Sequence, residues 1–313
     1  MAAPNGPAVY LPTIKPGEDL TKALTSLAEG TIQTRVVVID NGWGDESLSR
    51  VGELHPRAEL FRIPRNIGYG PALNRAVRER PADPVVFLND DIQCNPRFME
   101  ALLEVASGAE MVAAVLLRGD DPTRIDSAGI VADRSVMGFD YLNGEPVESA
   151  RNAPAPLGPT GGAALFRREA FEKAGGFDER MFAYYEDLDL VLRMRLAGAR
   201  CRLAPEAQAI HAYSATWGPG TGKKYARSGW SRGYMLRRYR VMRSPPLALH
   251  ALVCESALCC GQVVRDRTAR GLLGRVRGWR DAAGLEPRAT PPDCLLEPSV
   301  IRALSLRRRR RRA

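Results

Sequence analysis

Short apolar runs alternate with amphipathic stretches along the first half of the chain. The β-branched run at residues 35–40 and the apolar run at 84–89 are typical of buried strands. Residues 71–80 lie between them, space their apolar side chains as a helix does and open on a proline, which is favoured in the first helical turn. Another helix is predicted at 97–107 and another strand at 110–117. This alternation predicts an α/β fold with a mostly parallel sheet flanked by helices.

The second half follows the pattern less regularly. Residues 118–159 are polar and contain Gly and Pro, which predicts loops. We expect a strand at 160–167, a helix at 168–174, a helix that begins at the acidic pair 186–187, and a strand pair at 201–211. Residues 247–264 are apolar but interrupted by His250, Glu255 and Gln262. Because no uninterrupted apolar run of about 18 residues occurs, this segment predicts a helix on a surface and no membrane-spanning helix.

We expect three parts along the chain. These are a catalytic domain at 1–240, a C-terminal helical extension at 241–306 and a disordered basic tail at 307–313, because residues 307–312 are all arginine. The arginines near the apolar segment at 247–264 suit a peripheral contact with the inner face of a membrane. The alternative packs the same helix onto the domain or onto a second subunit of a homo-oligomer.

Composition narrows the class of protein. The 313 residues are 45% hydrophobic and 26% charged, which is ordinary for a globular protein with a sizeable core. The six cysteines have no repeated CxxC spacing, and the first residues lack the basic start and apolar run of a secretory signal. A cytoplasmic protein with reduced thiols is therefore expected.

Polar side chains follow the two predicted strands at 35–40 and 84–89. Asp40 ends one, and Asn89, Asp90 and Asp91 end the other, at the sheet edge where α/β proteins bind ligands. Carboxylates there suit Mg²⁺ or Mn²⁺, although both sequences also suit plain turns. The loop at 65–70 can bring backbone N–H groups to an anionic ligand, but it is neither a GxGxxG fingerprint nor a P-loop. A dehydrogenase or an ATPase is therefore disfavoured.

The pair Glu186-Asp187 stands at the predicted start of a helix, after two tyrosines. The positive end of the helix dipole favours the charged form of carboxylates in the first turn. A rigidly held carboxylate of this kind suits a general base that takes a proton from a hydroxyl group.

Six segments in order resemble one family. They lie at residues 36–41, 65–74, 87–91, 161–171, 175–179 and 184–190. Together they resemble the inverting GT-A glycosyltransferases of the large second sequence family, and within it the bacterial rhamnosyltransferase-type enzymes. The resemblance runs from about residue 36 to about residue 240, most of the chain.

The resemblance implies a GT-A type fold, a nucleotide-sugar donor, Mn²⁺ or Mg²⁺, and an acceptor hydroxyl of a glycan, a lipid-linked precursor or a natural product. A dTDP- or UDP-activated deoxysugar is favoured as donor. The implied residues are the catalytic Asp187 with Glu186 beside it, donor-binding Pro12, Asp40, Asn66, Gly68, Asn89 and Asp90, acceptor-binding Gly161 and Gly162, and the metal ligands Asp91 and His211.

Three departures from the family pattern are visible. The opening segment at 8–16 keeps only a strand and Pro12-Thr13, and the metal motif reads Asn-Asp-Asp in place of Asp-x-Asp. The Gly-rich loop at 215–224 is read as a flap over the donor or as a plain loop.

Two other functions stay open at this point. A nucleotidyltransferase also uses acidic metal ligands, but the early phosphate loop with a following lysine is missing. A basic nucleic-acid-binding protein would fit the net charge of +9, but aromatic side chains are not interleaved with the basic clusters. We therefore expect no nucleic-acid partner.

Overall fold

The computed structural model describes residues 6–14, 17–44, 51–55, 57–212 and 222–301. Most of the expected flap at 215–224 and the whole basic tail at 307–313 lie outside these residues. All six cysteines are free thiols, as the sequence predicts.

The helices and strands follow one another as the alternating pattern predicts, with additions. The first part contains β1 (Ala8–Thr13), α1 (Glu18–Ala28), β2 (Arg35–Asn41), α2 (Val51–Leu54), β3 (Ala58–Ile63), α3 (Tyr69–Glu79), β4 (Val85–Leu88), β5 (Ile92–Cys94), α4 (Phe98–Val105) and β6 (Met111–Arg118). The middle contains β7 (Ile125–Ser127), β8 (Ile130–Ala132), β9 (Gly138–Asp140), η2 (Val147–Ala150), β10 (Ala163–Phe166), α5 (Arg168–Lys173), α6 (Glu186–Leu196) and β11 (Cys201–His211). The end contains α7 (Gly222–Arg238), η3 (Val241–Arg243), α8 (Pro245–Asp266) and α9 (Arg270–Asp281).

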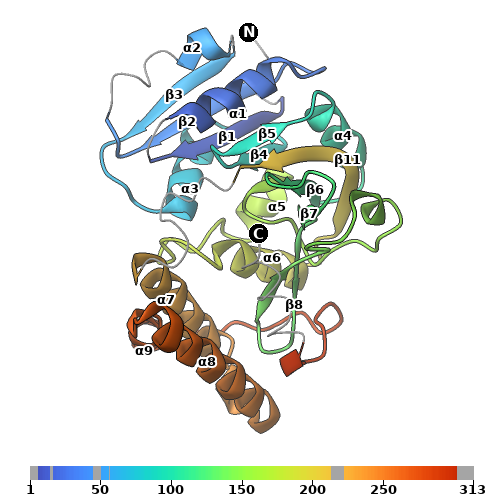
Figure 1. Cartoon of the computed structure of the whole chain (residues 1–313). Helices are drawn as coiled ribbons and strands as arrows, with labels where there is room; N and C mark the ends of the chain where they lie inside the picture. Colours follow the sequence, from blue (N-terminus) through green and yellow to red (C-terminus); the bar gives the residue numbers. More distant parts are fainter. Residues whose placement is uncertain (1–5, 15–16, 45–50, 56, 213–221, 302–313) are drawn as a thin grey trace.

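A central sheet carries the core on both of its faces (Figure 1). Its strand order is β3-β2-β1-β4-β10-β6-β11-β5, with β7 beside β6. In β1, Ala8 and Tyr10 pack into one core with α3, α5 and α6, whereas Val9 and Leu11 pack into the other with α1 and α4. Burial on both faces explains why these strands read as continuous apolar runs.

Strand direction brings the candidate residues to one edge of the sheet. The strands β3, β2, β1 and β4 are parallel, and β6 is parallel to β11, but β10 runs antiparallel to its neighbours β4 and β6. The start of β10 therefore meets the ends of the parallel strands, with Ala163 opposite Leu88. The predicted α/β fold is confirmed, and its sheet is mixed.

One expectation about the strands was wrong. Residues 201–211 form a single strand, β11, and not a strand pair. Its register against β6 shifts between Leu203 and Gln208, and Pro205 lies inside this irregular stretch. Proline cannot donate a ladder hydrogen bond, so Pro205 indicates a break between two strands in the sequence. In the structure one strand continues through it and only bends.

Helices α7, α8 and α9 form a layer beyond α6, at the bottom of Figure 1. Helices α7 and α9 approach closely because glycines face the contact: a Cβ at Gly278 would lie 1.8 Å from the carbonyl oxygen of Trp230. By length and mean hydropathy alone, α8 is long and apolar enough to cross a membrane, which the run-length criterion did not predict. The domain boundary near residue 240 stays a prediction, and α7 pairs with α9 across it.

Candidate active site

The acidic pair stands where α6 begins. Tyr184 and Tyr185 both have positive φ angles, 69° and 68°, which are costly for side chains of this size. This left-handed pair turns the chain sharply, so Glu186 and Asp187 occupy the first turn of α6. Strained backbone of this kind is concentrated at functional sites, where the surrounding structure fixes it.

Asp187 is held in place by backbone N–H groups. Its Oδ2 accepts a hydrogen bond from the N–H of Gly161 at 3.0 Å, and its Oδ1 accepts one from the N–H of Leu188 at 2.8 Å. Gly161 precedes β10, so the antiparallel strand places it against the start of α6. The carboxylate is partly exposed, as a base that must reach a substrate requires.

Glu186 differs from Asp187 in its environment. It is buried, and its Oε2 has no hydrogen-bond partner among the described residues. Burial, together with the negative charge of Asp187, raises the pKa of Glu186 to about 8. The expectation that the helix dipole keeps both carboxylates charged is therefore wrong for Glu186, because desolvation outweighs the dipole.

Tyr69 lies at the centre of the candidate site. Its hydroxyl donates a hydrogen bond to the carbonyl of Gly161, and its N–H donates one to the carbonyl of Phe182 at 2.9 Å. Burial raises the pKa of Tyr69 well above its ordinary value, and four negative charges add to it, those of Glu186, Asp187, Asp90 and Asp91. Tyr69 therefore contacts the predicted acceptor residue Gly161, and the charges of carboxylates assigned to base, donor and metal act on its hydroxyl.

Two loops interlock at the ends of β2 and β3. Asn41 donates to the carbonyl of Gly68 at 3.0 Å and accepts from the N–H of Ile67 at 3.0 Å, while Asn66 accepts from the N–H of Gly68 at 3.0 Å. Gly68 has a φ of 101°, and a Cβ there would lie 2.7 Å from the carbonyl oxygen of Phe182. The predicted donor-binding Asn66 and Gly68 thus form one rigid loop with Asn41, which the sequence reading had not singled out.

The remaining predicted donor residues line the same edge. Pro12 and Asp40 end the neighbouring strands β1 and β2. The Asp40 carboxylate accepts hydrogen bonds from the N–H groups of Trp43 at 2.8 Å and Gly44 at 3.1 Å, so it also closes a turn, as the plainer reading expected. The N–H of Asn89 donates to the carbonyl of Gly162 at 3.0 Å, which joins the metal motif to the predicted acceptor glycines.

Two adjacent carboxylates follow β4. Burial, with the charge of Asp91 adding to it, raises the pKa of Asp90 to about 6. Asp91 is buried, and its Oδ1 has no hydrogen-bond partner among the described residues. A buried carboxylate oxygen without a partner is costly unless a cation or donor meets it.

His211 stands beside Asp91 at the end of β11. Its Nε2 lies 3.5 Å from Asp91 Oδ2, and its Nδ1 lies 2.8 Å from Asp126 Oδ2. Burial lowers the pKa of His211, but the hydrogen bond to Asp126 and the charge of Asp91 outweigh it and raise the pKa to about 9. Asp126, at β7, orients the imidazole and was missed in the sequence, because its segment was read as loop.

The pair Asp91 and His211 fits part of a metal site. Within the described ranges, no group of three or more His, Cys, Asp or Glu side chains is arranged to hold a metal ion. A carboxylate with a partnerless buried oxygen and an imidazole oriented through its other nitrogen are nevertheless a donor set that suits Mn²⁺. Further ligands would then come from a bound substrate or from water.

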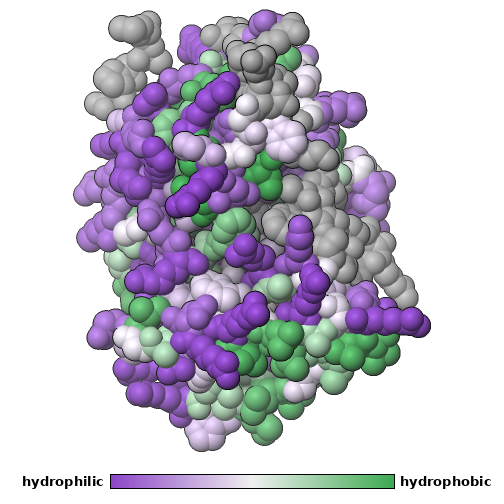
Figure 2. Space-filling view, turned by 90° about the vertical axis from the view of Figure 1, so that its left-hand side faces the viewer, coloured by the Kyte–Doolittle hydropathy of each residue, from purple (hydrophilic) through white to green (hydrophobic). Residues whose placement is uncertain are grey.

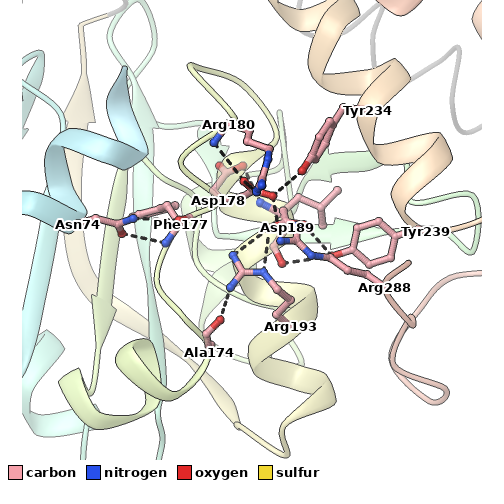
Figure 3. A network of polar contacts seen from close by, with 12 residues as sticks. Asn74, Ala174, Phe177, Asp178, Arg180, Asp189, Arg193, Tyr234, Tyr239 and Arg288 are labelled. Carbon is pink, nitrogen blue, oxygen red and sulfur yellow. Dashed lines mark hydrogen bonds and ion pairs between the residues drawn. The ribbon is translucent and has the colours of Figure 1, made fainter. Parts of the chain in front are cut away.

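A buried ionic network supports α6 from behind (Figure 3). Arg288, which follows α9, places Nη2 at 2.9 Å from Asp178 Oδ2 and Nη1 against Asp189 Oδ1. Asp178 also accepts from the hydroxyl of Tyr234 at 2.7 Å, and Asp189 accepts from that of Tyr239 at 2.9 Å. Burial alone would raise the pKa of Asp178, but the Tyr234, Arg180 and Arg288 donors lower it. The residues on both sides of the acidic pair are therefore held by Arg288, which lies far along the chain.

A cavity of about 250 Å³ adjoins the loop before α6. The Arg227 guanidinium lies 4.0 Å above the ring of Phe182, and Ser231 donates to the carbonyl of Ala183 at 2.9 Å. The lining residues are Arg180, Phe182, Ala183, Arg227, Trp230 and Ser231. One guanidinium group over an aromatic ring and a second arginine in the lining suit an anionic ligand that also carries apolar atoms.

Comparison with known proteins decides the family. The model of glycosyl transferase family 2 matches residues 8–175, more than half of the chain, and that of glycosyl transferase family group 2 matches residues 136–265. The chain belongs to glycosyl transferase family 2. It is a glycosyltransferase that uses a nucleotide-sugar donor, as the six segments predict.

Relatives of this glycosyltransferase include rhamnosyltransferases. The N-acetylglucosaminyl-diphospho-decaprenol L-rhamnosyltransferase of Mycobacterium tuberculosis is 30% identical over 225 residues, which are 64% of this chain and 73% of the relative. The rhamnosyltransferase WbbL of Escherichia coli is 45% identical over 226 residues, which are 65% of this chain and 83% of the relative.

Solved structures of low sequence identity share the fold. GalNAc-T7 with UDP, GalNAc and Mn²⁺ matches with a TM-score of 0.63 at 12% identity, over 90% of this chain and 55% of that one. The mannosyltransferase PcManGT of Pyrobaculum calidifontis with GDP-Man and Mn²⁺ matches with a TM-score of 0.54 at 18% identity, over 90% of this chain and 76% of that one.

The raised pKa of Glu186 has a consequence for stability. Its pKa is about 8 in the folded chain and 4.5 ordinarily, so this group lowers the stability of the fold as pH rises from about 4.5 to about 8. Glu186→Gln keeps the shape and removes this titration. We expect the melting temperature of the variant, relative to the original chain, to be higher at pH 8 than at pH 5 in calorimetry. A difference that does not change with pH would contradict the assignment.

The network behind α6 predicts that Arg288 is essential for stability. Arg288→Met removes the cation that the buried carboxylates of Asp178 and Asp189 share and leaves Asp189 only its second ion pair, with Arg193, so we expect a loss of about 3 kcal/mol in the free energy of unfolding by urea denaturation. The control is Arg180→Met, whose side chain is 60% exposed and lies 3.7 Å from Asp178. The control should lose less than about 1 kcal/mol. Equal effects of both variants would contradict the role of the buried bridge.

Proposed function

We propose that this chain is an inverting, metal-dependent glycosyltransferase that moves a rhamnose-like deoxysugar from a dTDP or UDP donor to a hydroxyl of a lipid-linked acceptor. One observation carries the proposal. The Asp187 carboxylate accepts a hydrogen bond from the N–H of Gly161, and the next residue, Gly162, accepts one from the N–H of Asn89, which begins the acidic motif of the donor edge. A base and a diphosphate-binding edge are thus close together.

Asp187 is the general base of the proposed reaction. It accepts the proton of the acceptor hydroxyl while that oxygen attacks the anomeric carbon of the donor sugar. The bond to the acceptor oxygen forms as the bond to the diphosphate breaks on the opposite side, so the configuration inverts. Burial raises the pKa of Glu186 and so favours its neutral form, whereas Asp187 accepts two backbone hydrogen bonds, which suit a charged carboxylate.

Asp91 and His211 are the proposed metal ligands, with Asp126 as the residue that orients the imidazole. A bound Mn²⁺ or Mg²⁺ supplies positive charge that stabilises the departing diphosphate. Asn41, Asn66 and Gly68 form the floor on which the nucleoside is proposed to bind. Gly161 and Gly162 face the acceptor side beside the base.

The names of the relatives support the choice of donor and acceptor. Two of them are rhamnosyltransferases, and the mycobacterial one acts on a sugar that is linked through a diphosphate to a lipid. The cavity with Arg180 and Arg227 beside the loop before α6 suits such a phosphate. We therefore place the enzyme in the cytoplasm, at the inner face of the membrane where a lipid-linked acceptor is anchored. The family assignment favours this reading over the nucleotidyltransferase and nucleic-acid-binding alternatives.

A panel of nucleotide sugars tests the reaction. We expect transfer from a dTDP- or UDP-activated deoxysugar to a polyprenyl-diphosphate-linked sugar, followed by mass spectrometry, with the anomeric configuration read by NMR. Asp187→Asn should lower kcat at least about 1,000-fold, because the amide cannot take a proton, and should leave the Kd of the nucleotide diphosphate nearly unchanged.

The matched control is Asp121→Asn, an exposed carboxylate that closes a surface turn, and it should keep its activity. Near-normal transfer by Asp187→Asn would contradict the base assignment. A product that retains the donor configuration would contradict the inverting mechanism.

The metal assignment predicts a graded loss of Mn²⁺ affinity. Calorimetric titration of Mn²⁺ in the presence of the nucleotide diphosphate should show no binding for Asp91→Ala. Asp126→Asn should bind about 10- to 100-fold more weakly, because His211 loses its orienting partner. Asp121→Asn again serves as the control. Unchanged affinity in Asp91→Ala would show that the metal binds elsewhere.

A further inference from the structure

An uncovered apolar surface lies on the outer side of the helical layer. Among the described residues, eight of the eleven exposed large hydrophobic side chains lie on α8 and α9. We call this set the α8–α9 face: Leu249, Leu252, Val253, Val263, Val264, Leu272, Leu273 and Val276. Figure 2 shows apolar side chains gathered at the lower end of the molecule, bordered by hydrophilic ones. Such a concentration marks an interaction surface.

Helix α8 is one-sided. From 247 to 264 its exposed positions recur every three or four residues, and none of them is charged. Leu249 is 66% exposed and Val264 is 77% exposed, at opposite ends of the helix. On the other side Cys254 is buried, and His250 Nε2 lies 3.3 Å from Asp133 Oδ2. The apolar stripe therefore faces outward because the sequence places uncharged, mostly apolar residues at the exposed positions of the helix.

The inner side of α8 is tied to the protein by ions. Glu255 lies 2.6 Å from the guanidinium of Arg232 on α7 and 2.6 Å from that of Arg275 on α9. Arg232, which is 1% exposed, also donates to the carbonyl of Val136 at 2.8 Å. A helix that crossed a bilayer would have to leave this triad or carry it into hydrocarbon, which is costly. This ion triad therefore favours a long helix α8 that lies along a surface over one that spans a bilayer.

The border of the face is basic. Five exposed arginines follow or punctuate the apolar positions: Arg265, Arg267, Arg270, Arg277 and Arg280. The two nearby acids are engaged, since Asp266 accepts from the Tyr225 hydroxyl at 2.6 Å and Asp281 from the Trp230 indole at 2.7 Å. Apolar side chains ringed by arginines match an anionic headgroup layer over hydrocarbon. In a dimer formed through this face, the arginines of the two copies would repel one another, so an anionic bilayer fits the face better than a second copy of the chain.

We propose that the α8–α9 face is a docking surface for an anionic lipid bilayer, with both helices lying in the plane of the headgroups. The chemistry that binds is shallow insertion of the apolar side chains together with attraction of the arginines to lipid phosphates. This surface is separate from the catalytic site, so its test does not depend on which sugar or acceptor is used.

Flotation of the full chain with lipid vesicles tests the proposal. The chain should float with vesicles that contain phosphatidylglycerol, bind much more weakly to pure phosphatidylcholine, and be released by high salt. A variant with Val264→Ser, Leu272→Ser and Leu273→Ser, and another with Arg265→Glu and Arg277→Glu, should each partition at least about tenfold less. All of the substituted side chains are exposed, so the fold should be preserved, and the melting temperatures of the variants and of the original chain check this.

Matched substitutions elsewhere provide the controls. Leu196→Ser removes an exposed leucine on α6, and Arg62→Glu reverses an exposed arginine on β3, and neither should change flotation. A chain that ends at residue 306 separates the effect of the arginine tail and should still depend on the α8–α9 face. Undiminished flotation of both face variants would overturn the proposal. So would resistance to salt extraction, which indicates a spanning helix, or a change in dimer content without a change in flotation.

Discussion

The structure depends on one partly buried arginine that serves two buried carboxylates. Asp178 and Asp189 stand on either side of the acidic pair in sequence, and neither is exposed to water. Arg288 meets both, two tyrosine hydroxyls donate to them, and Arg193 lies 2.9 Å from the second oxygen of Asp189. Buried charges are tolerated only when paired in this way. The helix that carries the proposed base is therefore held in part by a residue about a hundred positions further along the chain, and the C-terminal segment is part of the framework of the candidate site.

Two neighbouring carboxylates at the start of α6 acquire different chemistry from their surroundings. Asp187 is partly exposed and accepts two backbone hydrogen bonds, so its ionised form is supported. Glu186 points into the protein, where burial raises its pKa. The left-handed Tyr184 and Tyr185 cause this difference, because they set the angle at which the helix starts. Sequence adjacency alone could not separate the two side chains.

Much of the sheet and of its ligand edge could be predicted from the sequence. Strands such as β2 and β4 are buried on both faces, so their apolar runs are unambiguous, and polar residues at their ends mark the site. The helix α7 was missed, and α9 was covered only by the prediction of a helical extension at 241–306, because glycine disfavours helices in isolation and is justified here only by close packing. Tyr69, Asn41 and Asp126 were missed because their roles come from partners distant in sequence.

The late position of Arg288 also bears on how the enzyme is made. A chain emerging from the ribosome can form the sheet and the core that contains α1 and α4 from the first 211 residues, since these strands pair only with one another, whereas the other core also takes Tyr234 and Met235 of α7. Arg193 can pair with Asp189 as soon as α6 forms, but the cation that joins Asp178 to Asp189 is present only once residue 288 has been synthesised. The framework around α6 is therefore completed after the sheet, and a chain that stops before residue 288 holds this helix without the bridge between its two flanking carboxylates.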